Sequence, residues 1–269
     1  MVGQNKLIAK LKSYTNATLP HSMLFLGESG CGKHTLVSEM AKMFNLPLID
    51  ATEVLSPESI EEMKLRSVPT MYLISMDSIS ERAQNSLLKL VEEPGSNAYV
   101  VLIGSSKYGI LDTILNRCII YDFEPYTVAE LSEIVGEEIP AKVLAVTTTP
   151  GQIKVTLNRY DALMTLCATI GTKMCKARFT NALSIADKIN YKDEYDKFDF
   201  YVFIKALKMS LADLYIKTNE ETAIKLYNIV QEEAEKLVDS RLNKEVFMYH
   251  LLTRLWFASR GDVRWLVKN

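Results

Sequence analysis

One stretch, Leu24-Phe25-Leu26-Gly27-Glu28-Ser29-Gly30-Cys31-Gly32-Lys33-His34-Thr35-Leu36, decides how the first part of this chain folds. An apolar run enters a glycine-rich loop, and the chain leaves the loop through a lysine into a segment with helical spacing. This order predicts a strand, a phosphate-binding loop and a helix. Glycines let backbone N–H groups surround an anion, while the lysine and the helix start add positive charge. The candidate phosphate-binding residues are Gly27, Gly30, Cys31, Gly32, Lys33, His34 and Thr35.

One position departs from the phosphate-loop pattern. After the lysine the pattern has Ser or Thr, whose hydroxyl binds Mg²⁺. His34 occupies that place here, and Thr35 follows one residue later. We therefore expect phosphate binding to survive and the placement of Mg²⁺ to be altered. The alternative is a loop that keeps its shape and no longer binds nucleotide.

Composition and charge are those of an ordinary globular protein. Hydrophobic residues make up 48% of the 269 residues and charged residues 24%, so a large core is available. The length favours two domains and allows three small ones. The net charge of −2 gives no sign of a globally basic nucleic-acid binder, although a local basic face is compatible with it.

The cysteines and the chain start bear on metal binding and location. The four cysteines are far apart and form no C-x-x-C pair: Cys31, Cys118, Cys167 and Cys175. No zinc site is expected, and free thiols in a reducing cytosol are the simpler interpretation. No apolar segment is long enough to span a bilayer, and Met1 is followed by Val-Gly-Gln rather than a signal peptide. We expect a cytoplasmic protein without membrane contact.

Short apolar runs alternate with helical patterns through the first 124 residues. The expected strands are 23–26, 48–50, 71–74, 99–103 and 118–121. The expected helices are 4–14, 35–44, one that begins at Ser56-Pro57, and 83–92. Strands that alternate with helices at this spacing predict an α/β fold with a parallel sheet covered on both faces.

Beyond Pro125 the apolar strand patterns stop and helical patterns take over. Short helices broken at Pro140 and Pro150-Gly151 suggest a small bundle. Longer amphipathic helices are expected at 162–175, 179–189, 200–216, 221–237 and 243–260. The predicted organisation is an α/β nucleotide-binding domain at 1–124, a helical lid at 125–160 and an all-helical domain at 161–269.

Four short blocks occur in a characteristic order. They are Val2-Gly3-Gln4, the Leu-Pro-His-Ser lead-in to the loop at 19–22, Ala-Gln-Asn-Ser-Leu-Leu-Lys-Leu-Val-Glu-Glu-Pro at 83–94, and Thr-Ile-Leu-Asn-Arg-Cys at 113–118. Together they resemble the clamp-loader branch of the AAA+ ATPases. Proteins of this branch are found in DNA polymerase III holoenzymes. The resemblance covers about the first 160 residues and implies a AAA+ P-loop NTPase domain, a lid and a helical collar.

The resemblance also implies nucleotide contacts outside the loop. The block with Val2 and Gln4 is similar to the one that contacts adenine in the family. Pro150-Gly151-Gln152-Ile153-Lys154 resembles the second sensor, where many relatives carry arginine. Lys154 keeps the charge and lacks the bidentate guanidinium fork. Many bacterial loader subunits carry a four-cysteine zinc module, for which this chain has no ligands; this points to a divergent version, of cellular or phage origin.

The metal side of the site departs from the family pattern. In hydrolysing members, the strand before the Ala-Gln-Asn helix ends in Asp-Glu, which helps to hold Mg²⁺ and orients the attacking water. Ile74 and Ser75 occupy those places. An alkyl group cannot bind a hard cation, and a serine cannot act as a carboxylate base. We expect little or no ATP hydrolysis; the rival interpretation is that Asp77 moves into the metal site.

Arg117 matches the arginine of the family's Ser-Arg-Cys motif, with Asn116 in the serine place. In the family this arginine reaches the γ-phosphate of ATP bound by the neighbouring subunit. Such an arginine is worth a factor of about 10³–10⁵ in rate in GTPases. Arg117 is therefore the candidate catalytic residue, acting in trans. A structural arginine at a strand start is the alternative.

Retention of Arg117 with loss of the carboxylates resembles the δ′ subunit, the stator of bacterial loaders. The resemblance implies partners: other loader subunits in a hetero-oligomer, a sliding clamp, and primed DNA bound without sequence preference. The cofactor would be ATP or ADP, bound weakly or not at all, with Mg²⁺ left open. Two alternatives remain: an active AAA+ ATPase, either a loader motor or a replication-associated remodeller, and an assembly scaffold that binds no nucleotide.

Overall fold

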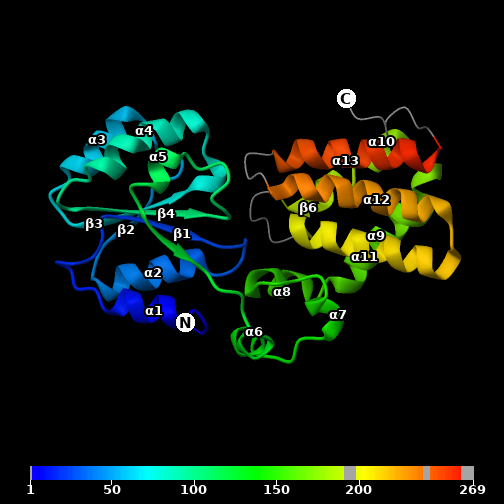
Figure 1. Cartoon of the computed structure of the whole chain (residues 1–269), viewed down its shortest axis with the longest axis horizontal. Helices are drawn as coiled ribbons and strands as arrows, with labels where there is room; N and C mark the ends of the chain where they lie inside the picture. The colour runs from blue at the N-terminus through cyan, green and yellow to red at the C-terminus, as the bar shows by residue number, and fades with distance from the viewer. Residues whose placement is uncertain (1, 191–197, 239–242, 262–269) are drawn as a thin grey trace. The chain divides into compact units, whose positions relative to one another are not determined.

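The structure is a computed structural model that describes residues 2–190, 198–238 and 243–261 (Figure 1). Contacts between Cα atoms divide the chain into two compact units. The first is Met1–Gly136 with Thr149–Gly151, and the second is Glu137–Thr148 with Gln152–Asn269. The predicted lid residues are shared between the two units, and the three-part division stays a prediction. None of the helices in the described ranges has the length and apolarity to cross a membrane.

The first unit contains a five-stranded sheet with the order β2-β3-β4-β1-β5, in which all neighbours are parallel. Its strands are β1 (Ser22–Leu26), β2 (Leu48–Asp50), β3 (Thr70–Ser75), β4 (Ala98–Gly104) and β5 (Ile119–Asp122). Its helices are α1 (Asn5–Lys12), α2 (Lys33–Met43), α3 (Pro57–Leu65), α4 (Glu81–Glu92), α5 (Asp112–Leu115), α6 (Val128–Val135) and the 3₁₀ turn η1 (Met76–Ser78). The α/β fold class predicted from the apolar runs is confirmed.

The sheet is covered on both faces, as Figure 1 shows for α1 and α2 on one side and α3, α4 and α5 on the other. Successive strand residues point to opposite faces. Phe25 accordingly belongs to the core cluster that contains residues of α1 and α2, and Leu24 belongs to the cluster that contains residues of α3 and α4. The inner strands β1, β3 and β4 are therefore almost wholly buried and mostly apolar, whereas the edge strands β2 and β5 each end in an exposed aspartate.

Local sequence sets the helix starts. Ser56 and Ser59 form a capping box at the start of α3, with Pro57 in the first turn, as predicted. The hydroxyl of Ser80 accepts a hydrogen bond from the N–H of Ala83, so α4 begins two residues before the predicted start at 83. In both helices, a serine side chain supplies an acceptor that the helix itself lacks.

The second unit is built from α7 (Ala141–Leu144), most of α8 (Pro150–Thr156), α9 (Tyr160–Lys173), α10 (Phe179–Leu183), α11 (Phe200–Thr218), α12 (Glu221–Glu235) and α13 (Lys244–Ser259). Short elements complete it: η2 (Met174–Lys176), η3 (Ala186–Lys188), η4 (Lys236–Val238), β6 (Ile189–Asn190) and β7 (Phe198–Asp199). Helix α11 packs against α9 and α12, and α12 packs against α13.

The prediction of one helix at 179–189 is wrong. Helix α10 ends at Leu183, and Ile189 pairs in parallel with Phe198 as part of β6 and β7. Ile189 is fully buried at this bridge. Tertiary packing of a β-branched side chain therefore overrides the apolar spacing, and the region is not wholly helical.

A charged cluster is buried between α12 and α13. Glu233 is 1% exposed, and its carboxylate forms ion pairs with Arg254 and with Lys236, the latter at 2.7 Å. Arg254 also contacts Glu232 at 3.1 Å. Burial raises the pKa of Glu233, but the hydrogen bonds and charges of Lys236 and Arg254 outweigh burial and hold the pKa below its usual value. The cluster therefore stays ionised and joins the two helices.

We predict that Glu233→Gln lowers the free energy of unfolding by about 3–5 kcal/mol, because it leaves the buried Arg254 without its main counter-charge. Glu232→Gln, at a carboxylate that is 36% exposed, is the matched control and should cost less than about 1 kcal/mol. Urea unfolding at neutral pH measures both. Equal effects for the two variants would contradict this role for Glu233.

The same variant should reveal a pH dependence. Because the pKa of folded Glu233 lies below its usual value of 4.5, its contribution is fully present above that value. The contribution is lost as pH falls through the lowered pKa, when the carboxylate becomes protonated in the folded state. The stability difference between wild type and Glu233→Gln should therefore narrow below about pH 4.5. Urea unfolding from about pH 3 to 7 would show it; a constant difference would argue against it.

Candidate functional site

The glycine-rich loop lies at the carboxyl end of β1, where α/β sheets place their ligand sites. β1 is an inner strand between β4 and β5, and the N–H of Gly27 donates to the carbonyl of Gly104 at 3.1 Å. Gly30 and Gly32 have φ values of 78° and 99°, which L side chains rarely adopt. The glycines at these two positions are therefore required by the path of the loop.

The start of α2 presents uncapped donors. Gly32 is its N-cap residue and provides no side-chain acceptor. The first N–H groups of a helix lack intrahelical partners, and they carry the positive end of the dipole. His34 and Thr35 lie exposed in this first turn. The geometry is that of an anion-binding helix start, in contrast to the serine-capped α3 and α4.

Lys33 turns back into the loop. Its side chain is buried, and Nζ donates to the carbonyls of Gly27 and Glu28, the latter at 3.0 Å. The sulfur of Cys31 lies 3.9 Å from Nζ. Burial raises the pKa of the Cys31 thiol, and the nearby Lys33 charge opposes this less strongly, so the thiol stays protonated. Phosphate oxygens would have to replace the loop carbonyls as partners of Lys33.

Two hydroxyl groups from distant parts of the chain hold the loop from outside. Tyr126 donates to the carbonyl of Cys31 at 2.6 Å, and burial raises the pKa of Tyr126, which keeps this hydroxyl protonated. Thr149 donates to the carbonyl of Ser29 at 2.8 Å. Both hydrogen bonds fix carbonyl groups of the loop and so help to hold its path.

Gly151 approaches the loop closely. Its N–H donates to the carbonyl of Gly30 at 3.0 Å, and a Cβ at position 151 would lie 2.7 Å from the Gly30 Cα. Two backbones meet here without room for a side chain. The Pro-Gly pair at the start of α8 therefore braces the phosphate loop.

The last two residues of β3, Ile74 and Ser75, supply no carboxylate. Ile74 is fully buried in the sheet, and the N–H of Ser75 donates to the Thr52 hydroxyl at 3.0 Å. Asp77 follows in η1, where both its oxygens accept hydrogen bonds from Ser105, at 2.9 Å from the N–H and 2.6 Å from the hydroxyl. Among the residues that the structure describes, no group of three or more His, Cys, Asp or Glu side chains has the arrangement of a metal site.

The other predicted nucleotide-binding residues lie outside the loop. Gln4 is buried, and its side-chain amide exchanges two hydrogen bonds with the backbone of Glu124, at 2.7 and 2.9 Å. Val2 is half-buried in front of it, and Lys154 is exposed on α8. Gln4 thus has a clear structural task, which is to join the chain start to the segment that leads into α6.

Arg117 stands at the opposite edge of the sheet from the loop. β5 runs parallel to β1, with Ile119 beside Met23. Arg117 precedes Ile119 by two residues, near the amino ends of the strands, whereas Gly27 follows the carboxyl end of β1. With a rise of about 3.3 Å per residue, an offset of about six residues separates the two levels by roughly 20 Å. Arg117 is not placed to serve its own loop.

The Arg117 side chain is held by contacts within the chain. One terminal nitrogen lies 2.6 Å from a carboxylate oxygen of Glu92, the last residue of α4, and the other donates to the carbonyl of Thr113 in α5 at 2.8 Å. The side chain is 38% exposed. The guanidinium is therefore oriented at the surface and remains partly exposed to solvent.

Sequence reasoning missed Tyr126, Thr149 and Glu92 as parts of this arrangement. Their partners lie 25 or more residues away in sequence, so no local spacing signals the contacts. The Glu-Glu-Pro end of the 83–94 block was a weak signal for Glu92. The others become visible only when the strands are aligned.

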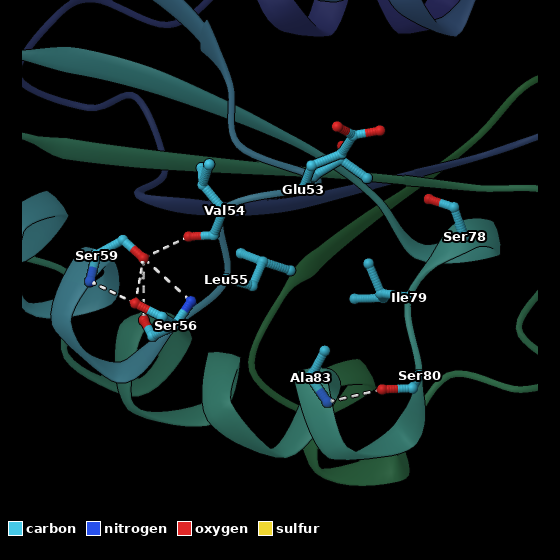
Figure 2. A pocket seen from close by; sticks show the side chains of 10 residues that line it. Glu53, Val54, Leu55, Ser56, Ser59, Ser78, Ile79, Ser80 and Ala83 are labelled. Carbon is cyan, nitrogen blue, oxygen red and sulfur yellow. Dashed lines mark hydrogen bonds between the residues drawn. The ribbon is translucent and has the colours of Figure 1, made fainter.

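A separate open groove lies beyond the carboxyl ends of β2 and β3 (Figure 2). Its lining includes Ser56 and Ser80, whose hydroxyls already accept hydrogen bonds at the starts of α3 and α4. Glu58 and Glu81 lie in the first turns of these helices. Capping and negative charge both weaken the attraction of these helix starts for phosphate, so the groove does not extend the phosphate site.

Comparisons with known proteins point to DNA replication factors. The profile of a family described as DNA polymerase III, delta subunit, matches residues 50–127. A replication factor C small subunit from Methanoregula boonei is 25% identical over 209 residues, which cover 68% of this chain and 65% of that protein. DNA polymerase III subunit delta′ from Bacillus subtilis is 39% identical over 69 residues, covering 25% of this chain and 21% of that protein.

Among solved structures, a DNA polymerase III gamma subunit-related protein from Thermotoga maritima matches with a TM-score of 0.44 and 13% identity, over 95% of this chain and 99% of that chain. The chain spans less than two thirds of the length of each of the two sequence relatives. The family match at 50–127 includes β3, Asp77, α4 and Arg117.

We predict that Gly151→Ala destabilises the first unit by about 1–3 kcal/mol, because the new methyl group overlaps the backbone of Gly30. Asn158→Ala, at an exposed residue just after α8, is the control and should have little effect. Urea unfolding and hydrogen exchange at the loop amides measure the change. Unaltered exchange at residues 28–32 would mean that Gly151 does not brace the loop.

Proposed function

Because the chain is a member of the AAA+ clamp-loader family, we propose that it is a δ′-like stator of a DNA polymerase III-type clamp loader. In this role it helps to load a sliding clamp onto primed DNA. It supplies Arg117 to the ATP site of a neighbouring subunit and hydrolyses little or no ATP itself. The match to delta′ over 69 residues supports this choice within the family.

The observation that carries the proposal is the position of Arg117. The residue lies at the amino edge of the sheet, opposite to its own phosphate loop, with an exposed and oriented guanidinium. An arginine at this position can act on a phosphate only if that phosphate is bound by another molecule. An arginine supplied in trans is known to stabilise the charge on a phosphoryl group during its transfer.

The carboxyl end of β3 supports the loss of hydrolysis. Ile74 and Ser75 cannot replace a metal ligand and a water-orienting carboxylate. Asp77 is the nearest acid in sequence, and both its oxygens are engaged by Ser105. Without a carboxylate to help hold Mg²⁺ or orient water, bound ATP would persist. The loop with Lys33 would bind ATP or ADP weakly, or serve as scaffold.

An active ATPase is the second candidate function. The intact glycines, Lys33 and the uncapped start of α2 favour it, since they form a complete anion cradle. This candidate requires Asp77 to exchange a Ser105 hydrogen bond for a metal ion. A scaffold that binds no nucleotide is the third, and the self-contacts of Lys33 favour it.

The proposed partners follow from the family. They are other loader subunits in a hetero-oligomer, the sliding clamp and primed DNA, in the cytoplasm. The starts of α3 and α4 are capped and acidic, so we expect any DNA contact to use other surfaces. Phosphate contacts without base readout would make that binding independent of sequence.

We predict that Arg117→Ala lowers ATP turnover by the assembled loader and leaves assembly intact. At the neighbouring site the loss should be about 10³-fold or more. Turnover and subunit composition of the complex purified through a tag on this chain measure both effects, with the exposed Arg82→Ala as control. Unchanged turnover would exclude the trans role of Arg117.

We also predict that the purified chain alone shows no Mg²⁺-dependent ATP turnover, with or without primed DNA, because the acids of β3 are missing. A parallel titration with ATP and with ADP measures binding to the loop. Turnover that disappears in Lys33→Ala would favour the motor candidate. Failure to bind at millimolar ATP would favour the scaffold.

A further inference from the structure

Arg117 is held at the end of a short segment that α4 braces at both ends. At the start of the segment, the buried side-chain amide of Gln84 donates to the carbonyl of Gly109 at 2.8 Å and accepts from the N–H of Leu111 at 3.0 Å. At its end, Glu92 pairs with Arg117 at 2.6 Å. Both ends of the segment 109–117 are thus attached to the same helix, α4.

Helix α4 can hold this segment in place because the inner face of the helix is buried in the core. Leu87 and Leu90 are fully buried, and Glu92 lies at the helix end only two residues further on. A carboxylate on this helix gives the guanidinium a defined direction. An arginine without such a partner would sample many rotamers.

The contacts of Arg117 leave part of the guanidinium unused. The two terminal nitrogens each make one contact to the protein, and the group offers five N–H donors in a planar fork. The exposed fractions of Arg117 and Glu92 are 38% and 42%, so water or a partner reaches the pair. Glu92 can hold one edge of the fork while another edge meets a phosphate oxygen.

We propose that Glu92 is a positioning residue for Arg117, which aligns the guanidinium for the ATP site of the neighbouring subunit. The inference rests on the proposed function and adds to it the residue that sets the geometry of the finger. The pair is too exposed to add much stability, so its effect falls on orientation. Small displacements of a catalytic group reduce rate far more than they reduce binding.

The test uses the assembled loader, purified through a tag on this chain and supplied with ATP, Mg²⁺ and primed DNA. Arg117→Ala first defines the part of the turnover that depends on the finger. Glu92→Gln should lower that part of the turnover about three- to tenfold. This is more than the small energy of an exposed ion pair alone would give, and less than the roughly hundredfold loss of rate expected for a misplaced catalytic group. KM for ATP should change less than about twofold, because binding is not the affected step.

Three matched variants separate positioning from general damage. Glu93→Gln changes the adjacent exposed carboxylate and should match wild type. Glu92→Asp keeps the charge and should recover part of the rate. The double variant Glu92→Gln with Arg117→Ala should be no slower than Arg117→Ala alone, because Glu92 acts only through the arginine.

Each outcome separates the two proposals. Wild-type turnover in Glu92→Gln, together with a loss in Arg117→Ala, would overturn the positioning role and leave the proposed function intact. Faster turnover in Glu92→Gln would overturn it too, since Glu92 would then restrain the finger. A further loss in the double variant would show an action independent of Arg117. No loss in Arg117→Ala would overturn the proposed function and this inference with it.

Discussion

The parallel pairing of β1 with β5 is the constraint on which the rest of the molecule depends. Parallel strands place their amino ends at one edge of a sheet and their carboxyl ends at the other. β1 delivers the glycine-rich loop at the carboxyl edge, and the approach to β5 leaves Arg117 at the amino edge. The chain therefore presents an anion cradle at one edge of the sheet and a cation at the other, which is the arrangement that the proposed role in a row of subunits requires.

The two chemical groups are supported in different ways. The loop is anchored through its carbonyl groups by Tyr126, Thr149 and Gly151, which come from segments about 100 residues further along the chain. Arg117 is supported within a short segment that α4 holds. The loop is thus a built cradle, and the buried Ile74 at the carboxyl end of β3 supplies no ligand to it. The role proposed for Arg117 is mainly electrostatic and needs no such ligand, only the right direction of a guanidinium.

Burial decides what the charged pairs contribute. The pair of Glu233 and Arg254 lies almost completely inside the second unit, where loss of one partner would strand the other charge in a poorly solvated place. The pair of Glu92 and Arg117 has both side chains more than a third exposed, so water screens it. The first pair acts on stability and the second on orientation, although both consist of one carboxylate and one guanidinium.

The sequence by itself determined the elements whose signals are local. The apolar runs predicted the five strands, the Ser56-Pro57 pair predicted the start of α3, and the glycine spacing predicted the loop before α2. Each depends on backbone propensity or on periodic burial, which neighbouring residues express. The single helix expected at 179–189 is wrong, because a buried Ile189 pairs with Phe198, nine residues later.

Only the tertiary structure decided which groups meet. The hydrogen bonds of Asp77 to Ser105, of Gln4 to Glu124 and of Tyr126 to the loop join residues 28 to 120 positions apart. No spacing in the chain encodes such contacts, since they depend on strand order and register. The placement of Arg117 and the phosphate loop at opposite edges of the sheet has the same origin. Both can be identified in the sequence, but the edge at which each lies follows from the parallel pairing of the strands.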